Sequence, residues 1–156
     1  GNPFWNESAL FKTNKGTSFR VNVWWKGAHM GGERAQWIGT DMSFYTPNRL
    51  GTESVLVNAT KQLGKDDAGF VRTAPKTEQY EQPDWWKTDL LPVPLRHNSG
   101  HHGSHTFITH EFVTACVEKR KPTIDILEAL AYTVPGIIAH ESALKGGVSM
   151  EIPQFD

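Results

Sequence analysis

The stretch SALFKTNKGTSFRVNVWWKG, residues Ser8–Gly27, decides the fold class of this chain. Its second half alternates apolar and polar residues, which is the period of a β-strand with one buried face. The apolar members of this alternation are Phe19, Val21, Val23 and Trp25. Asn14-Lys15-Gly16 supplies the residues of a tight turn ahead of them. The stretch therefore predicts a β-hairpin whose strands cover Ala9–Thr13 and Ser18–Lys26.

The segment after the hairpin, GGERAQWIGTDMSFY, extends it into a meander with short strands over Glu33–Ile38 and Met42–Tyr45. Trp24 lies on the otherwise polar face of the hairpin, which indicates that another subunit or another segment covers this face. Residues 46–100 are poorly patterned, although SVLVN and GFVRT are typical of strands. Four prolines are expected to interrupt any longer element there: Pro75, Pro83, Pro92 and Pro94.

The apolar period of a helix begins after residue 103 and continues to about Arg120. Ser104 or Thr106 is suited to cap its start, and Lys121-Pro122 stops it. We expect one apolar stripe of this helix to be buried, and the stripe consists of Ile108, Phe112, Val113, Cys116 and Val117. Because Cys116 is the only cysteine, we interpret it as a core residue without a disulfide.

A second helix begins at a capping-box pattern, with Asp125 as the N-cap and Glu128 three residues later. Pro135 predicts a kink inside it, and Gly146-Gly147 ends it. Its apolar face consists of Leu127, Leu130, Val134, Ile137, Ile138 and Leu144. The final VSMEIPQF is typical of a strand. Strands followed by helices predict an α+β fold for residues 1–156 as a single domain, with a mostly antiparallel sheet and two main helices packed on one face.

The charge balance and the hydropathy exclude two kinds of partner. A formal net charge of −1 and a pI of about 6.7 leave no basic surface of the kind that binds nucleic acid. No stretch reaches the roughly 18 apolar residues of a membrane span. The chain begins with Gly1-Asn2 and no initiator Met, which indicates a processed or recombinant fragment. The absence of a secretory signal therefore leaves the localisation open.

The stretch HNSGHHGSHTFITHEF, His97–Phe112, holds five of the seven histidines. A zinc-dependent hydrolase is one hypothesis, because four of them have spacings that permit shared metal ligation: His101, His102, His105 and His110. Neither of the two His-Glu pairs in the chain completes H-E-x-x-H, and there are no paired cysteines. We therefore assign no metal ligand. His140 shares an apolar helical stripe and is interpreted as a core histidine with a satisfied hydrogen bond.

The glycines and serines of Ser99–His105 also point to ligand binding at the start of a helix. Backbone N–H groups in a first helical turn lack helical partners and bind anions or hydroxyls. Imidazoles beside them hydrogen-bond substrate hydroxyls and transfer protons near neutral pH. The alternative is that these histidines are simply exposed on a loop.

From Gly100 to Phe155 the sequence resembles the C-terminal end of the Gfo/Idh/MocA family of NAD(P)-dependent oxidoreductases. The shared features are H-x-G-S-H, H-E-F-V, R-K-P-x-x-D, T-x-x-G-I-x-A-H-E-S-A and a final I-P-x-F. The hairpin from Ala9 to Tyr45 is similar to the sheet region of the family more loosely. One branch, similar in its glycine- and histidine-bearing helix start, comprises glycosidases that retain NAD.

The resemblance implies a two-domain enzyme, with a Rossmann domain that binds NAD(P) and an α+β domain whose open sheet forms the oligomer interface. No G-x-G-x-x-G follows a strand here, and no histidine has Asp four residues before it, as the family's D-x-x-x-H requires. The family's catalytic Lys-Pro ends a Rossmann strand, so Lys121-Pro122 is interpreted as a helix stop instead. We expect that this chain alone binds no cofactor and is inactive without a missing N-terminal Rossmann domain.

The substrate-binding residues predicted from the helix start and the resemblance are His101, His102, Ser104 and His105, with Arg96 as an addition. Their expected role is to orient and hydrogen-bond a sugar-type substrate, and no catalytic residue is assigned. Further copies of the chain are the expected partners of the sheet face, whereas nucleic acid and membrane are not expected. A second hypothesis is a non-catalytic, sheet-mediated assembly module in which the histidines are incidental.

Overall fold

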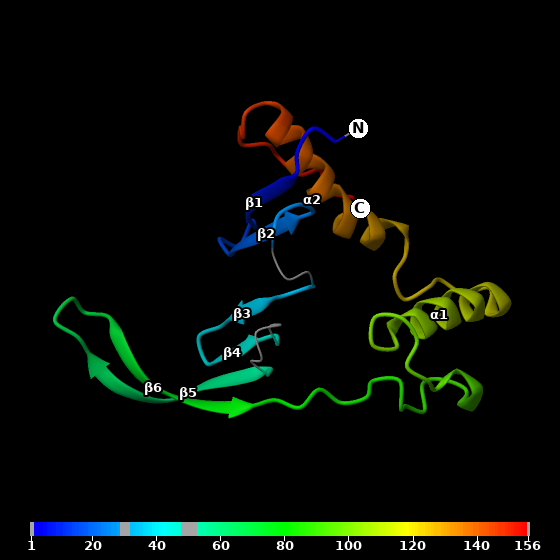
Figure 1. Cartoon of the computed structure of the whole chain (residues 1–156), viewed down its shortest axis with the longest axis horizontal. Helices are drawn as coiled ribbons and strands as arrows, with labels where there is room; N and C mark the ends of the chain where they lie inside the picture. The colour runs from blue at the N-terminus through cyan, green and yellow to red at the C-terminus, as the bar shows by residue number, and fades with distance from the viewer. Residues whose placement is uncertain (1, 29–31, 48–52, 156) are drawn as a thin grey trace. The chain divides into compact units, whose positions relative to one another are not determined.

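The computed structural model describes residues 2–28, 32–47 and 53–155 (Figure 1). The chain divides into two compact units, residues 1–28 together with 89–156, and residues 29–88. Each unit contains an antiparallel sheet, and the two main helices belong to the first. The α+β class predicted from the sequence is therefore confirmed.

The predicted hairpin is present in the first unit. β1 (Asn6–Lys12) pairs antiparallel with β2 (Ser18–Trp24), and Phe11 lies opposite Phe19 with the ring centroids 4.6 Å apart. Gly16 closes the turn with φ 83°, a conformation that glycine adopts without steric cost. However, β2 is exposed along its whole length, which corrects the expectation of a buried face. Alternation identifies which side chains share a face, but it does not show how much of that face is covered. Here the helix α2 (Ile126–Leu144) packs along β1, where Glu7, Ala9 and Phe11 are half-buried, and β2 stays exposed.

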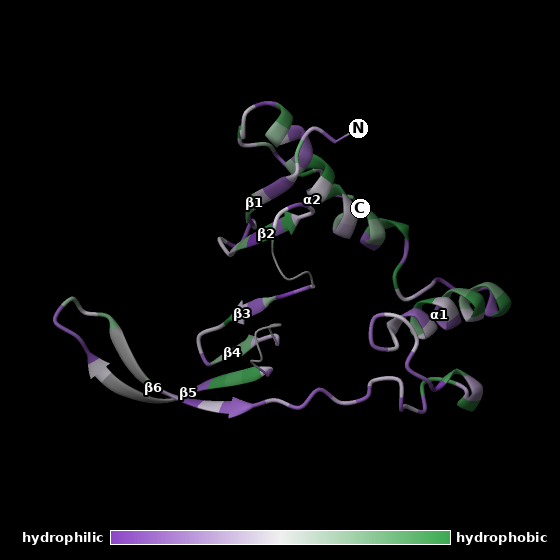
Figure 2. Ribbon diagram, in the orientation of Figure 1, coloured by the Kyte–Doolittle hydropathy of each residue, from purple (hydrophilic) through white to green (hydrophobic). Residues whose placement is uncertain are grey.

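The second unit is a separate four-stranded antiparallel sheet, which corrects the expectation of one continuous meander. The strands lie in the order β3 (Gln36–Ile38), β4 (Met42–Tyr45), β5 (Val55–Lys65) and β6 (Val71–Gln79). β5 begins with an apolar run that is visible in Figure 2. The ring of Phe44 meets that of Tyr80 edge-on, with centroids 5.4 Å apart.

β6 continues through Pro75, although the sequence predicted that this proline interrupts any strand. β6 is the edge strand of its sheet, where the missing N–H of a proline is tolerated. The ladder also shifts register between Ala59, which lies opposite Pro75, and Lys61. The edge position and this irregularity together accommodate the proline.

Both predicted helices form, as α1 (Ser104–Glu118) and α2 (Ile126–Leu144), and α2 packs along β1 (Figure 1). The predicted N-cap is confirmed, because the Asp125 carboxylate accepts the N–H of Glu128 at 3.0 Å. The helix continues through Pro135. Residues 148–155 contain no strand, so the predicted terminal strand is wrong. A strand requires a neighbour to pair with, and none of the described strands pairs with this segment.

The apolar stripe of α1 is exposed, contrary to the sequence-based expectation. Its members are Ile108, Phe112, Val113, Cys116 and Val117. On this helix only Thr106 and Ala115 are buried. Helical periodicity determines that these side chains share a face, but it carries no information about what covers the face.

Candidate functional site

The histidine loop, defined here as residues His97–His105, turns the chain into α1 through three consecutive left-handed residues. His101, His102 and Gly103 have φ angles of 53°, 57° and 94°. This conformation costs about 1–2 kcal/mol for a residue with a Cβ atom. Histidine is one of the residue types that adopts it most readily. Such a backbone persists only where neighbouring contacts fix it.

Ser99 supplies those contacts. Its hydroxyl oxygen accepts the N–H of Thr106 at 3.2 Å and the Thr106 hydroxyl at 2.7 Å. Its carbonyl oxygen accepts the N–H of Gly103 at 2.8 Å. Because the N-cap residue Gly103 has no side chain, Ser99 caps α1 from outside the helix. The expectation that Ser104 or Thr106 provides the cap is therefore wrong.

The backbone N–H groups at the start of α1 are occupied within the protein. The N–H of Ser104 donates to the carbonyl of His101 at 3.3 Å, and that of His105 donates to the carbonyl of Gly100 at 3.4 Å. The next N–H is bound by Ser99. The predicted capture of a ligand by free backbone N–H groups is therefore wrong, because the left-handed turn folds back over them. The side chains remain as the binding groups of the loop.

Four of the five predicted site residues lie exposed on this one turn: His101, His102, Ser104 and His105. The rings of His101 and His105 are 5.0 Å apart between centroids. Gly100 packs against the His105 ring so closely that a Cβ atom at Gly100 would collide with it. The glycine therefore permits the position of this imidazole.

Arg96, the fifth predicted residue, is engaged in the turn that precedes the histidine loop. Its Nε donates to the carbonyl of Leu91 at 2.7 Å, and its guanidinium pairs with Asp89 at 3.0 Å. Leu91 is 1% exposed and lies just before a short 3-10 helix, η1 (Val93–Leu95). These contacts make Arg96 a support of the turn.

The described residues provide no set of ligands for the hypothetical zinc ion. Within residues 2–28, 32–47 and 53–155, no three His, Cys, Asp or Glu side chains are grouped so that they could hold a metal ion. His110 lies on α1, and its Nδ1 is 3.4 Å from the Thr114 hydroxyl.

A second polar cluster, which we call the Glu111 hub, joins α1 to α2. The Glu111 carboxylate accepts two hydrogen bonds from the Arg120 guanidinium, both at 2.8 Å. It also accepts the N–H of Thr123 at 2.7 Å and the Thr123 hydroxyl at 2.9 Å. The hydrogen bonds from Arg120, and then those from Thr123, lower the pKa of Glu111 from 4.5 to about 2. The hub therefore holds a carboxylate that is ionised over most of the pH range.

Lys121 forms an ion pair with Asp125, the N-cap of α2. This pair, followed by the N–H of Glu128, lowers the pKa of Asp125. Lys121-Pro122 thus belongs to the connection between two helices, as predicted. The shared motifs H-E-F-V and R-K-P-x-x-D consequently have a structural explanation, because their Glu111, Arg120 and Asp125 order this connection.

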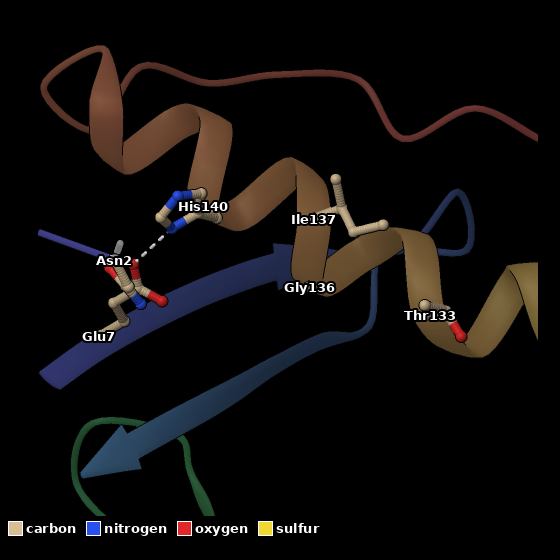
Figure 3. A pocket seen from close by; sticks show the side chains of 6 residues that line it. All are labelled: Asn2, Glu7, Thr133, Gly136, Ile137 and His140. Atoms are coloured by element: carbon tan, nitrogen blue, oxygen red, sulfur yellow. Dashed lines mark hydrogen bonds and ion pairs between the residues drawn. The ribbon is translucent and has the colours of Figure 1, made fainter. Parts of the chain in front are cut away.

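An open depression lies between β1 and α2 in the first unit (Figure 3). His140 Nδ1 is 2.9 Å from Oε1 of Glu7, and the ring of Phe4 meets the imidazole edge-on at 5.7 Å. The side chain of His140 is 33% exposed. The predicted satisfied hydrogen bond is confirmed, but the residue is half-buried instead of belonging to the core.

Comparison with known families identifies the lineage of the chain. A family model described as "Glycosyl hydrolase 109, C-terminal domain" matches residues 50–156. The chain belongs to the glycosyl hydrolase 109 C-terminal domain family. Family 109 lies among the Gfo/Idh/MocA-like NAD-dependent glycosidases, so the resemblance inferred from the motifs is confirmed. The match also extends through residues 50–97, where the sequence offered no recognisable motif.

A glycosyl hydrolase family 109 protein of Solibacter usitatus (strain Ellin6076) is 30% identical to this chain over 78 residues. The aligned segment covers 50% of this chain and 17% of that protein. The chain therefore spans only a small part of the length of this curated relative. No solved structure matches. None of the helices in the described parts of the chain is long and apolar enough to cross a membrane.

Sequence reasoning missed three residues that organise these sites: Ser99, Glu111 and Glu7. Ser99 has a weak local signal, since a serine close before a predicted helix is a candidate cap. Glu111 was noted as part of an incomplete metal motif and of the shared H-E-F-V, without a role of its own. Glu7 has no local signal at all, because its partner His140 is 133 residues away.

Proposed function

We propose that this chain is the substrate-side part of an NAD-dependent glycosidase of family 109, and that the histidine loop contacts the sugar. The observation that carries the proposal is the fixed turn that exposes His101, His102, Ser104 and His105 together. Imidazole and hydroxyl groups both donate and accept hydrogen bonds, which matches the hydroxyls of a sugar.

Within this site, His102 and His105 orient the sugar through hydrogen bonds, and Ser104 and His101 lie beside them. Gly100 sets the place of the His105 ring. Arg96 acts as a positioning residue, because its guanidinium is engaged with Asp89 and with the carbonyl of Leu91. Hydrogen bonds within the protein hold the turn, which reduces the entropy lost on binding.

The nucleotide cofactor is assigned to an N-terminal Rossmann domain of a longer protein. Both sheets in the described residues are antiparallel, whereas dinucleotide sites use parallel strands and a glycine-rich turn into a helix. The sheets in the described part of the chain therefore offer no fit for NAD(P). When bound by such a domain, the cofactor supplies the redox chemistry. The small share of the Solibacter relative that the chain covers supports this assignment.

The exposed hairpin supports a second role, in which further copies of the chain assemble through the sheet face. Its exposed apolar residues are Leu10, Phe19, Val21, Val23 and Trp24. Phe19, Val21 and Val23 share one face of the hairpin, whereas Leu10 and Trp24 lie on the other. The exposed apolar row of Phe19, Val21 and Val23 is typical of an interface. Light scattering of the wild-type chain and of Val21→Glu tests this role. An oligomer that Val21→Glu dissociates is expected, and a wild-type monomer contradicts assembly through the hairpin.

The enzymatic proposal is tested with the protein at its natural length. Nitrophenyl glycosides of hexoses and N-acetylhexosamines are supplied as substrates, with and without added NAD⁺ after the bound nucleotide is removed. We expect hydrolysis of at least one glycoside that depends on NAD⁺. Absence of hydrolysis across both anomers of the panel contradicts the proposal and favours the non-catalytic assembly module.

A further inference from the structure

The depression between β1 and α2 brings polar groups from both elements to one place (Figure 3). It is lined by Asn2, Glu7, Thr133, Gly136, Ile137 and His140. Its volume is about 510 Å³, within the roughly 300–1,000 Å³ of small-molecule sites. Four of the lining residues belong to the motif T-x-x-G-I-x-A-H-E-S-A, which the helix connection and the histidine loop do not explain.

The contact between His140 and Glu7 fixes the hydrogen-bonding character of the imidazole. An ionised carboxylate only accepts hydrogen bonds, so Nδ1 of His140 carries the proton that it donates to Oε1 of Glu7 at 2.9 Å. In the neutral ring, Nε2 is then an acceptor. The pair therefore offers an oriented imidazole acceptor and a carboxylate within the same depression, and both suit the hydroxyl donors of a neutral ligand.

Gly136 has no explanation within the described part of the chain. It lies inside α2 without a positive φ, so its backbone does not require glycine. A Cβ atom at this position would meet no atom within 4 Å, so packing does not require glycine either. Glycine is nevertheless the poorest helix former apart from proline. The space above Gly136 is open and lies in the depression, so a ligand can approach the backbone of α2 there.

We propose that this depression is a second carbohydrate-binding site, separate from the histidine loop, which takes one ring of a neutral sugar. The ring lies over Gly136 and against Ile137, which is 53% exposed, while its hydroxyls reach Glu7 and His140. The carboxylate of Glu7 repels an anionic sugar. That the ligand is a carbohydrate rests on the proposed function, whereas the position of the site does not.

The test is saturation-transfer NMR on the protein at its natural length, with D-glucose, D-galactose and N-acetyl-D-glucosamine as neutral probes and D-glucuronate as the anionic probe. We expect a neutral sugar to bind and glucuronate to bind at least tenfold more weakly. Gly136→Val and His140→Asn should each weaken neutral binding about tenfold, which corresponds to the loss of one contact or hydrogen bond. Glu141→Gln, on the same helix but outside the lining, is the matched control.

Gly136→Ala separates a ligand site from a structural role. Alanine favours the helix, so the thermal midpoint should rise while sugar binding falls. Binding of no neutral sugar, or binding that Gly136→Val leaves unchanged, overturns the second site. Binding that His102→Ala abolishes and Gly136→Val does not also overturns it, because the sugar then occupies only the histidine loop. Absence of glycoside hydrolysis in the wild-type protein would refute the proposed function, but it would leave the sugar-binding result at the depression unchanged.

Discussion

The histidine loop and the Glu111 hub both carry motifs shared with the family, yet their side chains are used in opposite ways. In the hub, four hydrogen bonds from Arg120 and Thr123 converge on the Glu111 carboxylate, so its polar atoms are engaged within the protein. In the loop, backbone bonds fix the turn, and the side chains of His102, Ser104 and His105 are exposed. The motif of the hub therefore has a structural role. The motif of the loop leaves side chains exposed, and we propose that these side chains contact the ligand.

The largest expected effect concerns the side chains of the histidine loop. In the natural-length protein, His102→Ala and His105→Ala should each lower kcat/KM about 10–100-fold, because each leaves a substrate hydroxyl without its hydrogen-bond partner, at a cost of about 1–3 kcal/mol. His110→Asn, five residues further along α1, is the matched control and should change kcat/KM little. Thermal midpoints should be similar in all three variants. Full activity in both loop variants would contradict the proposal that the histidine loop contacts the substrate.

Substitutions in the Glu111 hub, by contrast, should change the thermal stability of the protein. Glu111→Gln removes the charge that orients Arg120 and Thr123, so the thermal midpoint should fall by several degrees. Glu118→Gln, which removes only the 2.7 Å contact to Arg120 Nε, should lower it less. Differential scanning calorimetry measures both. Equal midpoints for the two variants would show that Glu111 does not organise the connection.

The stability that the Glu111 hub contributes should change with pH in one direction. The pKa of Glu111 is lowered from 4.5 to about 2 in the folded chain, mainly by Arg120. Its contribution to stability is therefore complete above pH 4.5 and is lost as the pH falls toward 2. The difference in thermal midpoint between wild type and Glu111→Gln should shrink across this window. A difference that stays constant from pH 5 to pH 2.5 contradicts the ionised hub.

The smallest expected effect concerns the cap that holds the loop on α1. Ser99→Ala removes the acceptor of the Thr106 N–H and should cost about 1 kcal/mol of unfolding free energy. Ser104→Ala removes the cap that the sequence suggested and should cost much less. Urea denaturation compares the two. A larger cost for Ser104→Ala would restore the original capping assignment.

Local patterns predicted the local elements well. The Phe19 to Trp25 alternation gave the hairpin, Asp125 gave the cap of α2, and Lys121-Pro122 gave the end of α1. Each of these depends on neighbours within a few residues, where backbone preference and capping chemistry dominate. That the four candidate site residues lie on one turn was predictable for the same reason, whereas their contact with a sugar stays a prediction.

Features that depend on distant partners were not predictable. The stripe of Phe112 and Val117 was expected to be buried, but one sequence does not reveal what covers a helix face. Pro75 was expected to break a strand, because its position at the edge of a sheet depends on the other strands. The pairing of Glu7 with His140 spans 133 residues and leaves no periodic signal.

The central claim is that this chain completes a sugar pocket whose nucleotide is held by another part of a longer protein. Isothermal titration of NAD⁺ into the 156-residue chain and into the natural-length protein tests it most directly. We expect one NAD⁺ per subunit in the natural-length protein and no binding by the 156 residues alone. Tight, stoichiometric binding by the 156-residue chain would contradict the account.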